Sequence, residues 1–342
     1  PSGCSVHQPP MLLDWLKLVR VTGLVTILTN IIAVVVTAVY ASEGLDPSWL
    51  IGRLHHNGFA RSAWLVTASC LLYLAGMLWN DLVDVGRDRV LHPRRPLPAG
   101  RIHLGTAYFV GVLLAVGALI SAAMVGVHAF YAAGVVLSLI MLYNLVTKDI
   151  PWIGSLTMGA VRFSHAIFAL LLLGTDYLKL AVLGHSAPGH GVLLAYPLIL
   201  GVYIFAVTLV SELESRPGRR FELLLGGGLL FGAVGAGGWM LLNAHWMSHL
   251  SQRDSTIHVV AIGMSAVLGV VLFGSLLWRI WRPWMAALRS GRSEQVGPVV
   301  GSALGGIIFL DALIATSAHP VGGLVILSLL PLFLLGKRFV QM

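Results

Sequence analysis

Three aspartates lie within eight residues of one another in a chain that has few acids. Asp81, Asp84 and Asp88 stand in the stretch "NDLVDVGRDRV". On a helix this spacing places all three carboxylates on one face, where like charges repel. A divalent cation would relieve that repulsion, and Mg²⁺ commonly bridges one or two carboxylates to a substrate phosphate. The spacing therefore predicts a Mg²⁺ site. The alternative for any single aspartate is a solvated helix end with mixed charges.

A run of arginines follows the aspartates. The stretch "RDRVLHPRRPLPAGR" supplies Arg87, Arg89, Arg94, Arg95 and Arg101. Guanidinium groups suit phosphate oxygens because their donors form a planar fork. Carboxylates, an implied metal and arginines at one end of a membrane protein predict a site for an anionic, phosphorylated ligand.

The elements that must position these residues are membrane-spanning helices. The chain is 57% hydrophobic and only 11% charged, with a mean hydropathy of +0.86, whereas soluble chains are usually about 25% charged. The apolar stretches lack the alternation of a membrane β-barrel. We expect an all-α bundle of nine to ten spans forming a single membrane domain over residues 1–342. The spans are expected near 22–40, 61–79, 104–124, 128–146, 153–174, 191–210, 222–243, 257–279 and 298–317, with a shorter tenth at 321–336.

Lys and Arg gather in alternate loops, which indicates the orientation of the chain. Loops rich in these residues stay in the cytoplasm. The rule places the N-terminus, the first acidic loop (80–103) and a second polar loop (211–221) on the cytoplasmic side. We expect the two loops to form a cap there.

The first acidic motif resembles a known family. "NDLVDVGRD" has the form N-D-x-x-D-x-x-x-D, and "RPLPAGRI" follows it. Together with "LYNLVTKDIPWIGSLTMGAVR", which carries Tyr143, Lys148, Gly154 and Arg162, they resemble the UbiA superfamily of intramembrane prenyltransferases. The resemblance implies a helical bundle whose cavity opens sideways to lipid. It also implies two acidic motifs that hold Mg²⁺ and an isoprenyl diphosphate, whose allylic cation alkylates a lipophilic, usually aromatic, acceptor.

The resemblance also implies roles for individual residues. The expected metal ligands are Asp81, Asp84, Asp88 and Glu214, and Tyr143 is expected near the developing cation or the acceptor. The expected diphosphate-binding residues are Asn80, Arg87, Arg95, Lys148 and Arg219, and the expected cavity residues are Arg20, Asn30, Arg162 and Asp311. The expected partners are the lipid bilayer, an isoprenyl diphosphate and a lipophilic acceptor, with no nucleic acid and no predicted oligomeric state.

The second polar loop departs from the family pattern. It reads "LVSELESRPGRR", so Ser215 and Arg219 stand where two acids are expected, and only Glu212 and Glu214 remain. On a helix these two glutamates would lie about 200° apart and would not share a face. In this departure the sequence resembles the EboC-type branch of the family. That branch comprises bacterial and algal proteins associated with handling or export of a secondary metabolite. The likeness places the chain in a bacterial inner membrane. It also leaves open a protein that binds or helps export a lipophilic metabolite without transferring a prenyl group.

Two charged residues are expected inside the membrane. Asp311 and Arg162 lie well inside apolar stretches, where a charge costs about 2.5–3.5 kcal/mol on insertion scales. Asp311 could form a functional site or a hydrogen bond to a neighbouring helix, for example at Ser302. Arg162 could pair with Asp311 or line the cavity. An unrelated transporter ranks last, because the sequence lacks the paired interrupted helices typical of such sites.

Overall fold

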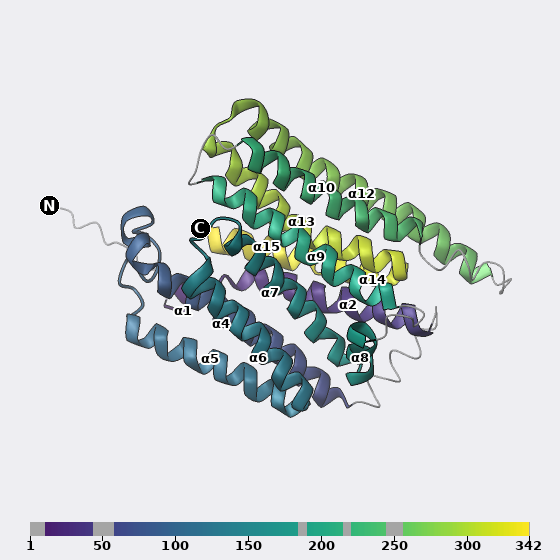
Figure 1. The fold of residues 1–342 in the computed structure, drawn as a ribbon, viewed down its shortest axis with the longest axis horizontal. Coiled ribbons are helices and arrows are strands. Elements are labelled where there is room, and N and C mark those ends of the chain that lie inside the picture. Colours follow the sequence, from purple (N-terminus) through teal and green to yellow (C-terminus); the bar gives the residue numbers. More distant parts are fainter. Residues whose placement is uncertain (1–10, 44–57, 184–189, 215–219, 244–255, 342) are drawn as a thin grey trace.

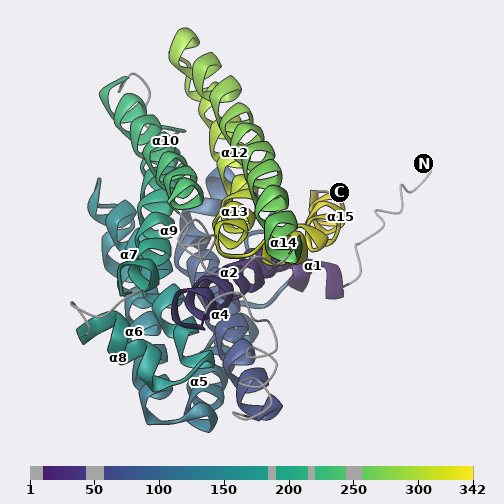
Figure 2. The same cartoon turned by 90° about the vertical axis from the view of Figure 1, so that its right-hand side faces the viewer.

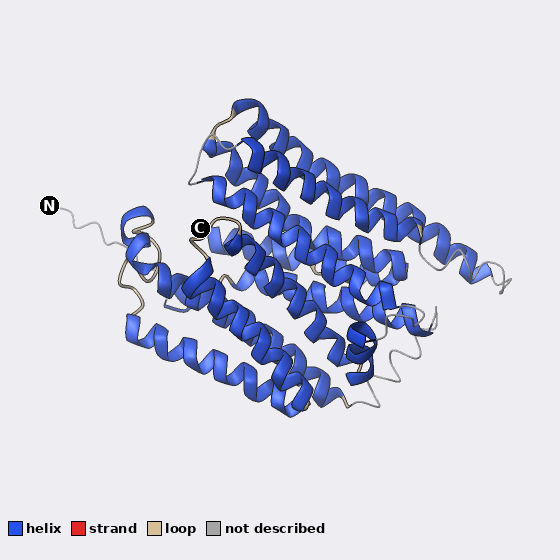
Figure 3. Cartoon of the chain, viewed as in Figure 1, coloured by secondary structure: helices blue, strands red, loops and turns tan. Residues whose placement is uncertain are grey.

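The computed structural model describes residues 11–43, 58–183, 190–214, 220–243 and 256–341. Every regular element within these ranges is a helix, and none of them contains a strand (Figures 1 and 3). Apolar runs of this length form helices in lipid because the helix satisfies all backbone N–H and C=O groups within the segment. The expected all-α fold is confirmed.

Nine helical segments among the described residues are long and apolar enough to cross a membrane. Shorter helices are α1 (Met11–Leu18), α8 (Thr175–Leu183), α14 (Pro320–Ser328) and α15 (Leu330–Gln341). The nine crossings are built on α2 (Leu24–Glu43), α4 (Phe59–Leu91), α5 (Leu104–Val125), α6 (Val127–Leu142), α7 (Ile153–Ala169), α9 (His190–Ser211), α10 (Arg220–Leu242), α12 (Thr256–Ser290) and α13 (Val296–Ala318).

The expected tenth crossing is a pair of short helices. α14 begins directly after α13, and α15 contacts α1 and the short helix η1 (Val21–Gly23) at the opposite end of the bundle. The pair is interrupted at Leu329, and Pro331 follows the interruption. Proline cannot donate the backbone hydrogen bond that a continuous helix needs there. The C-terminal helices therefore return toward α1, over a shorter apolar length than the other nine.

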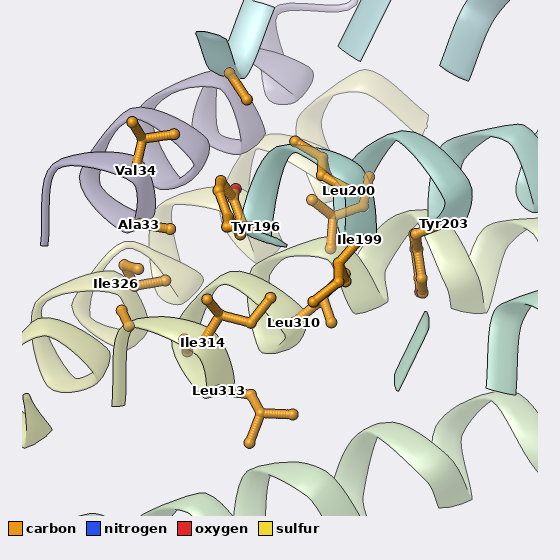
Figure 4. Packing of buried hydrophobic residues seen from close by; sticks show 14 of the residues in the cluster. Ala33, Val34, Tyr196, Ile199, Leu200, Tyr203, Leu310, Leu313, Ile314 and Ile326 are labelled. Atoms are coloured by element: carbon orange, nitrogen blue, oxygen red, sulfur yellow. The ribbon is translucent and has the colours of Figure 1, made fainter. Parts of the chain in front are cut away.

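The centre of the bundle is α13, most of whose residues are buried. It packs against α2, α9 and α14, where Ala33, Tyr196, Leu200, Leu310 and Ile326 interlock (Figure 4). α10 and α12 lie on one side of this centre, and α5 and α6 lie on the other (Figures 1 and 2). A second apolar cluster joins α4, α5, α6 and α7. Residues of both clusters, such as Ile27 and Leu72, line an apolar cavity.

α4 is longer than the expected second span. Residues 80–91 continue the helix, so the first acidic motif is helical and only residues 92–103 form the expected loop. The helix ends before Pro93, because a residue preceding proline disfavours helical backbone angles. A helix of 33 residues is roughly 50 Å long, which exceeds the thickness of the hydrocarbon core. The motif therefore lies at the membrane edge on a rigid extension of a span.

The loop after α4 folds back onto the helix bundle. Leu97 and Ile102 are buried against Leu18, Leu78 and Leu82. This loop thus packs against α4 and α1. Residues 215–219 of the second loop lie outside the described residues.

The first prediction concerns close packing of α10 against α12. A Cβ atom at Gly227 would lie 2.1 Å from Trp284 Nε1, and this nitrogen donates a hydrogen bond to the Leu223 carbonyl at 3.2 Å. The indole ring cannot move away without losing that bond. We expect Gly227→Ala to lower the free energy of unfolding by about 1–3 kcal/mol, measured as thermal unfolding in one detergent.

The neighbouring residue provides a matched control. A Cβ at Gly228 meets nothing within 4 Å, so Gly228→Ala should leave stability unchanged or raise it by about 0.5–1 kcal/mol through the loss of unfolded-state entropy. Equal unfolding temperatures for the two variants would contradict this packing.

Candidate functional site

The three aspartates of the first motif are buried, and each contacts a cation. Arg20 Nη2 lies 3.1 Å from Asp81 Oδ1. Asp84 Oδ2 lies 3.1 Å from Arg87 Nη2 and also contacts Lys148 Nζ. Arg95 Nη1 lies 2.6 Å from Asp88 Oδ2. Buried carboxylates require such pairing because an isolated charge is costly to desolvate.

Lys148 joins two of the expected site residues. Its ammonium donates to Asn80 Oδ1 at 3.0 Å and to Asp84. Burial lowers the pKa of Lys148, and its contact with Asp84 opposes that shift. Gly154 allows this arrangement, because a Cβ there would lie 2.8 Å from the Thr147 carbonyl oxygen and 2.9 Å from that of Lys148.

Arg20 has an unusual backbone. Its φ of 46° is in the left-handed region, which non-glycine residues rarely adopt. The carbonyl of Arg20 accepts hydrogen bonds from the Tyr73 hydroxyl at 3.1 Å and from the Gly23 amide at 2.8 Å. Strained backbone of this kind is concentrated at functional sites. Here it holds the side chain beside Asp81.

A basic pocket of about 600 Å³ adjoins the aspartates at the end of the bundle. Within the part of the chain that the structure describes, Asp81 is the one acidic residue that lines it. Five cationic side chains on its wall make it suited to an anion; they are Lys17, Arg20, Arg94, Arg95 and Arg101.

An apolar cavity of about 70 Å³ is lined by Asn80, the residue of α4 that precedes Asp81. Asn80 and Tyr143 lie at its motif end, and Arg162 and His165 line its wall. Tyr143 opens η2 (Tyr143–Thr147), a π-helical turn between α6 and α7. Such turns frequently occur at functional sites. Asn80 in the wall of the apolar cavity and Asp81 in the wall of the basic pocket are consecutive residues of α4, and the Asn80 amide nitrogen lies 3.4 Å from Asp81 Oδ1.

The two glutamates of the second loop point to different elements. They lie in η4 (Glu212–Glu214). The Ser155 hydroxyl donates to Glu212 Oε1 at 2.5 Å. Tyr143 is close enough for charge interactions with both Glu212 and Asp84. Glu214 is exposed, and a Cβ on Gly297 of α13 would lie 3.6 Å from its Oε1. The structure thus bonds Glu212 to α7 and directs Glu214 toward α13, while Arg219 lies outside the described residues.

The intramembrane charges belong to one buried network. Asp311 Oδ2 accepts hydrogen bonds from Thr29 Oγ1 at 2.6 Å and Asn30 Nδ2 at 2.7 Å, and its Oδ1 accepts one from the Tyr196 hydroxyl at 2.8 Å. Arg162 Nη1 donates to Asn30 Oδ1 at 3.2 Å. Arg162 therefore lines the cavity and is also linked to Asp311 by hydrogen bonds through Asn30. Ser302 has a different role, because its carbonyl accepts a hydrogen bond from Arg279 at 3.2 Å.

Within the described residues, no three Asp, Glu, His or Cys side chains come together as a group that could hold a metal. The three aspartates instead form separate ion pairs along α4. Their donor chemistry still fits Mg²⁺, since hard carboxylate oxygens on one helix face are the ligands this ion prefers together with phosphate oxygens.

Several site residues were not found from the sequence. Asp14 anchors α1 to the first loop by accepting a hydrogen bond from Arg101 Nε at 2.8 Å. Ser69, Asn144 and His165 line the apolar cavity. Of these residues, only His165 could have been predicted from the sequence, because it follows the intramembrane Arg162 by three residues and therefore lies on the same helix face.

The chain was compared with known sequences. The model of the UbiA prenyltransferase family matches residues 30–220. Digeranylgeranylglyceryl phosphate synthase of Pyrococcus horikoshii is 33% identical over 100 residues, covering 29% of this chain and 36% of the relative. The synthase of the same name from Methanosarcina mazei is 30% identical over 150 residues, covering 43% and 47% respectively. The chain thus spans less than half the length of these curated relatives.

Solved structures share the fold. A UbiA homologue from Aeropyrum pernix K1 superposes with a TM-score of 0.52 at 17% identity, covering 84% of this chain and 96% of that one. A structure from work on digeranylgeranylglyceryl phosphate synthase in membranes superposes with a TM-score of 0.53 at 16% identity, covering 90% and 98%. At these identities the likeness establishes the helical membrane fold. Because the family model covers more than half of the sequence, the chain belongs to the UbiA prenyltransferase family.

Proposed function

We propose that the chain is an intramembrane prenyltransferase that moves a prenyl group from its diphosphate to a lipophilic acceptor. The observation that carries this proposal is that consecutive residues of α4, Asn80 and Asp81, line an apolar cavity and a basic pocket. A prenyl diphosphate has the same two-part character, with an apolar chain joined to a highly charged group. Family membership and the name of the matching synthases support prenyl transfer.

The basic pocket would bind the diphosphate. Arg20 and Arg95 line it while contacting Asp81 and Asp88, and Lys148 and Arg87 contact Asp84. Asp81, Asp84 and Asp88 would hold Mg²⁺, which supplies positive charge to the departing diphosphate. The cations that now neutralise the aspartates could then turn to phosphate oxygens. Arg219 is proposed as a further phosphate ligand on the second loop.

The reaction would proceed by ionisation. The bond between C1 of the prenyl chain and the diphosphate oxygen breaks, and both electrons leave with the diphosphate. Lys148 and the arginines stabilise the charge that grows on the leaving group, which is the main electrostatic contribution available here. The Tyr143 oxygen lies at the motif end of the cavity, where the allylic cation would form. The acceptor then bonds to C1 and gives up a proton.

The cavity would protect the cation from water. Its wall includes Ile27, Leu72, Met77, Val136 and Met158. A dry site of this kind prevents hydrolysis of a reactive intermediate. Arg162, Asn30 and Asp311 are proposed to fix the wall opposite α4 and to orient the acceptor, since the three are linked by hydrogen bonds beside the cavity.

The location of the protein follows from the same features. Nine apolar helices among the described residues indicate an integral membrane protein. We extend the proposal to a single membrane domain in a bacterial inner membrane, with both motif loops in the cytoplasm. Basic loops stay on the cytoplasmic side, and the pocket beside the first motif is lined by basic residues.

A second candidate is a UbiA-like protein that binds or helps export a lipophilic metabolite. It is favoured by the second loop, where Glu214 is exposed and Glu212 accepts a hydrogen bond from Ser155 of α7. Such a protein would bind a prenyl diphosphate without ionising it.

The second prediction separates the two candidates. In lipid nanodiscs with Mg²⁺, farnesyl diphosphate and a membrane extract as the source of acceptor, we expect the wild type to release diphosphate, measured by a coupled phosphate assay. Asp84→Asn removes the carboxylate that contacts both Lys148 and Arg87. We expect this change to slow release about a hundredfold, the usual cost of losing one charge-stabilising group.

Asp176→Asn is the matched control, because Asp176 is an exposed aspartate on α8 whose ion pair within the described part of the chain is with Lys179 of the same helix. It should release diphosphate at the wild-type rate. Mg²⁺-dependent binding without release in the wild type would support the binding candidate. Release that persists in Asp84→Asn would contradict the assigned site.

The third prediction concerns the second loop. Glu212 is near Ser155 and Tyr143, whereas Glu214 points toward α13. We therefore expect Glu212→Gln to lower the rate of diphosphate release about tenfold, as for other supporting groups of a metal site. Glu214→Gln, which makes the same chemical change two residues away, should cause the smaller loss. The opposite order would show that Glu214 is the functional acid.

A further inference from the structure

Two cations on the wall of the basic pocket have no acidic partner among the described residues. Five Lys and Arg side chains line this pocket. Three of them, Arg20, Arg95 and Arg101, each contact an aspartate. Within the part of the chain that the structure describes, the side chains of Lys17 and Arg94 form neither an ion pair nor a hydrogen bond. The pocket therefore carries positive charge that these residues leave unbalanced, and a bound anion would balance it.

A buried ion pair connects the two segments that carry these cations. Asp14 of α1 is 2% exposed and accepts a hydrogen bond from Arg101 Nε at 2.8 Å. Arg101 Nη2 also donates to the Arg94 carbonyl at 3.0 Å. Lys17 follows Asp14 by three residues, which is close to one turn of α1. Arg101 thus ties the loop that carries Arg94 to the helix that carries Lys17.

Exposed apolar side chains place the pocket at the edge of the membrane. Leu91 lines the pocket and is 61% exposed, and its neighbour Val90 is 81% exposed. On α1, Leu12 is 69% exposed. Apolar side chains this exposed on a membrane protein favour contact with lipid, while neighbouring Lys and Arg side chains reach the headgroups. The two unbalanced cations are therefore expected at the depth of the lipid phosphate groups.

The hydrogen-bond donors of the two cations match a phosphate group. An ammonium offers three N–H donors and a guanidinium offers five, and neither group can accept. Phosphate oxygens accept several charge-assisted hydrogen bonds at once. The pocket has a volume of about 600 Å³, a size typical of sites for whole ligands. This size leaves room for an anion at Lys17 and Arg94 beside one at Arg20 and Arg95.

We infer that Lys17 and Arg94 form a subsite for the phosphate group of an anionic membrane lipid. A free phosphate would be held by these donors alone, whereas the chains of a lipid also contact exposed apolar side chains such as Leu91. The subsite goes beyond the proposed prenyl transfer, in which Arg20 and Arg95 contact the diphosphate. The lipid is not a reactant, and no covalent step occurs. A lipid bound there anchors α1 and the loop after α4 to the membrane surface.

The fourth prediction concerns the first lipid that the protein binds. The full chain in a neutral detergent is titrated with phosphatidic acid or with phosphatidylcholine, and native mass spectrometry gives the Kd of the first bound lipid. We expect phosphatidic acid to bind about twentyfold more tightly than phosphatidylcholine. Lys17→Met and Arg94→Met should each reduce this preference about fivefold, the factor that one basic residue provides near anionic lipid.

Arg289→Met is the matched control, since Arg289 is an exposed arginine in the last turn of α12 that does not line the pocket. Its preference should be that of the wild type. Equal binding of the two lipids to the wild type would overturn the inference, and so would an equal loss in Arg289→Met, which would indicate general surface charge. Millimolar inorganic phosphate should leave the preference intact, and displacement of phosphatidic acid by it would overturn the assignment to lipid.

Binding of farnesyl diphosphate with Mg²⁺ is measured on the same samples. Arg94→Met should weaken phosphatidic acid more than farnesyl diphosphate, and Arg95→Met, the same change at the next residue, should do the reverse. Equal effects of both variants on both ligands would overturn the separate subsite. Selective binding of phosphatidic acid without diphosphate binding would support the lipid subsite while contradicting the proposed function.

Discussion

Three carboxylates buried on one face of α4 need positive charge close by, and this requirement determines how the motif end of the bundle is built. Asp81 pairs with Arg20 of the segment before α2, and Asp84 pairs with Lys148 of the turn after η2. Asp88 pairs with Arg95 of the loop after α4. The cations come from separate segments, so the electrostatics also join those segments. Backbone conformations that are otherwise unfavourable persist there, including the left-handed Arg20 and the close approach at Gly154. Binding energy from the ion pairs can offset such strain.

The second constraint lies deeper, where Asp311 and Arg162 are held in the membrane interior. A single charge at that depth would be expelled or neutralised. Here Asn30 connects the two by accepting from Arg162 and donating to Asp311. The network joins α2, α7, α9 and α13, and thus links the central cluster to the wall of the cavity. Helix association in lipid receives little help from the hydrophobic effect, so these polar contacts and the tight glycine contacts determine which helices are neighbours.

The sequence predicted the parts of the site that are chemically conspicuous. Asp84 was selected by its spacing to the other aspartates, Asp311 because it is an acid inside an apolar stretch, and Lys148 through the resemblance to the family. The structure connects Arg162 to Asp311 through Asn30, a relay that spacing alone could not show. Neutral polar residues such as Ser69 and Asn144 were missed, because one serine or asparagine in a span is usually structural. The boundary of α4 was placed too early, since charged residues after an apolar run resemble a solvated loop; the helix continues to Leu91 because one of its faces stays buried.

The length of α4 has a consequence for how the two ends of the site work together. Ser69, Tyr73, Gly76 and Asn80 recur at intervals of three and four residues along the cavity, and the aspartates follow on the neighbouring face of the same helix. A continuous helix does not stretch, so the distance between the wall of the cavity and the charged groups is fixed at 1.5 Å per residue, or roughly 22 Å of helix from Ser69 to Asp84. Loops could let the two regions drift apart, but a single helix cannot. Substrates that meet between them must therefore match this spacing, and a chain or acceptor of the wrong length would leave either the charged groups without a partner or the cavity unfilled.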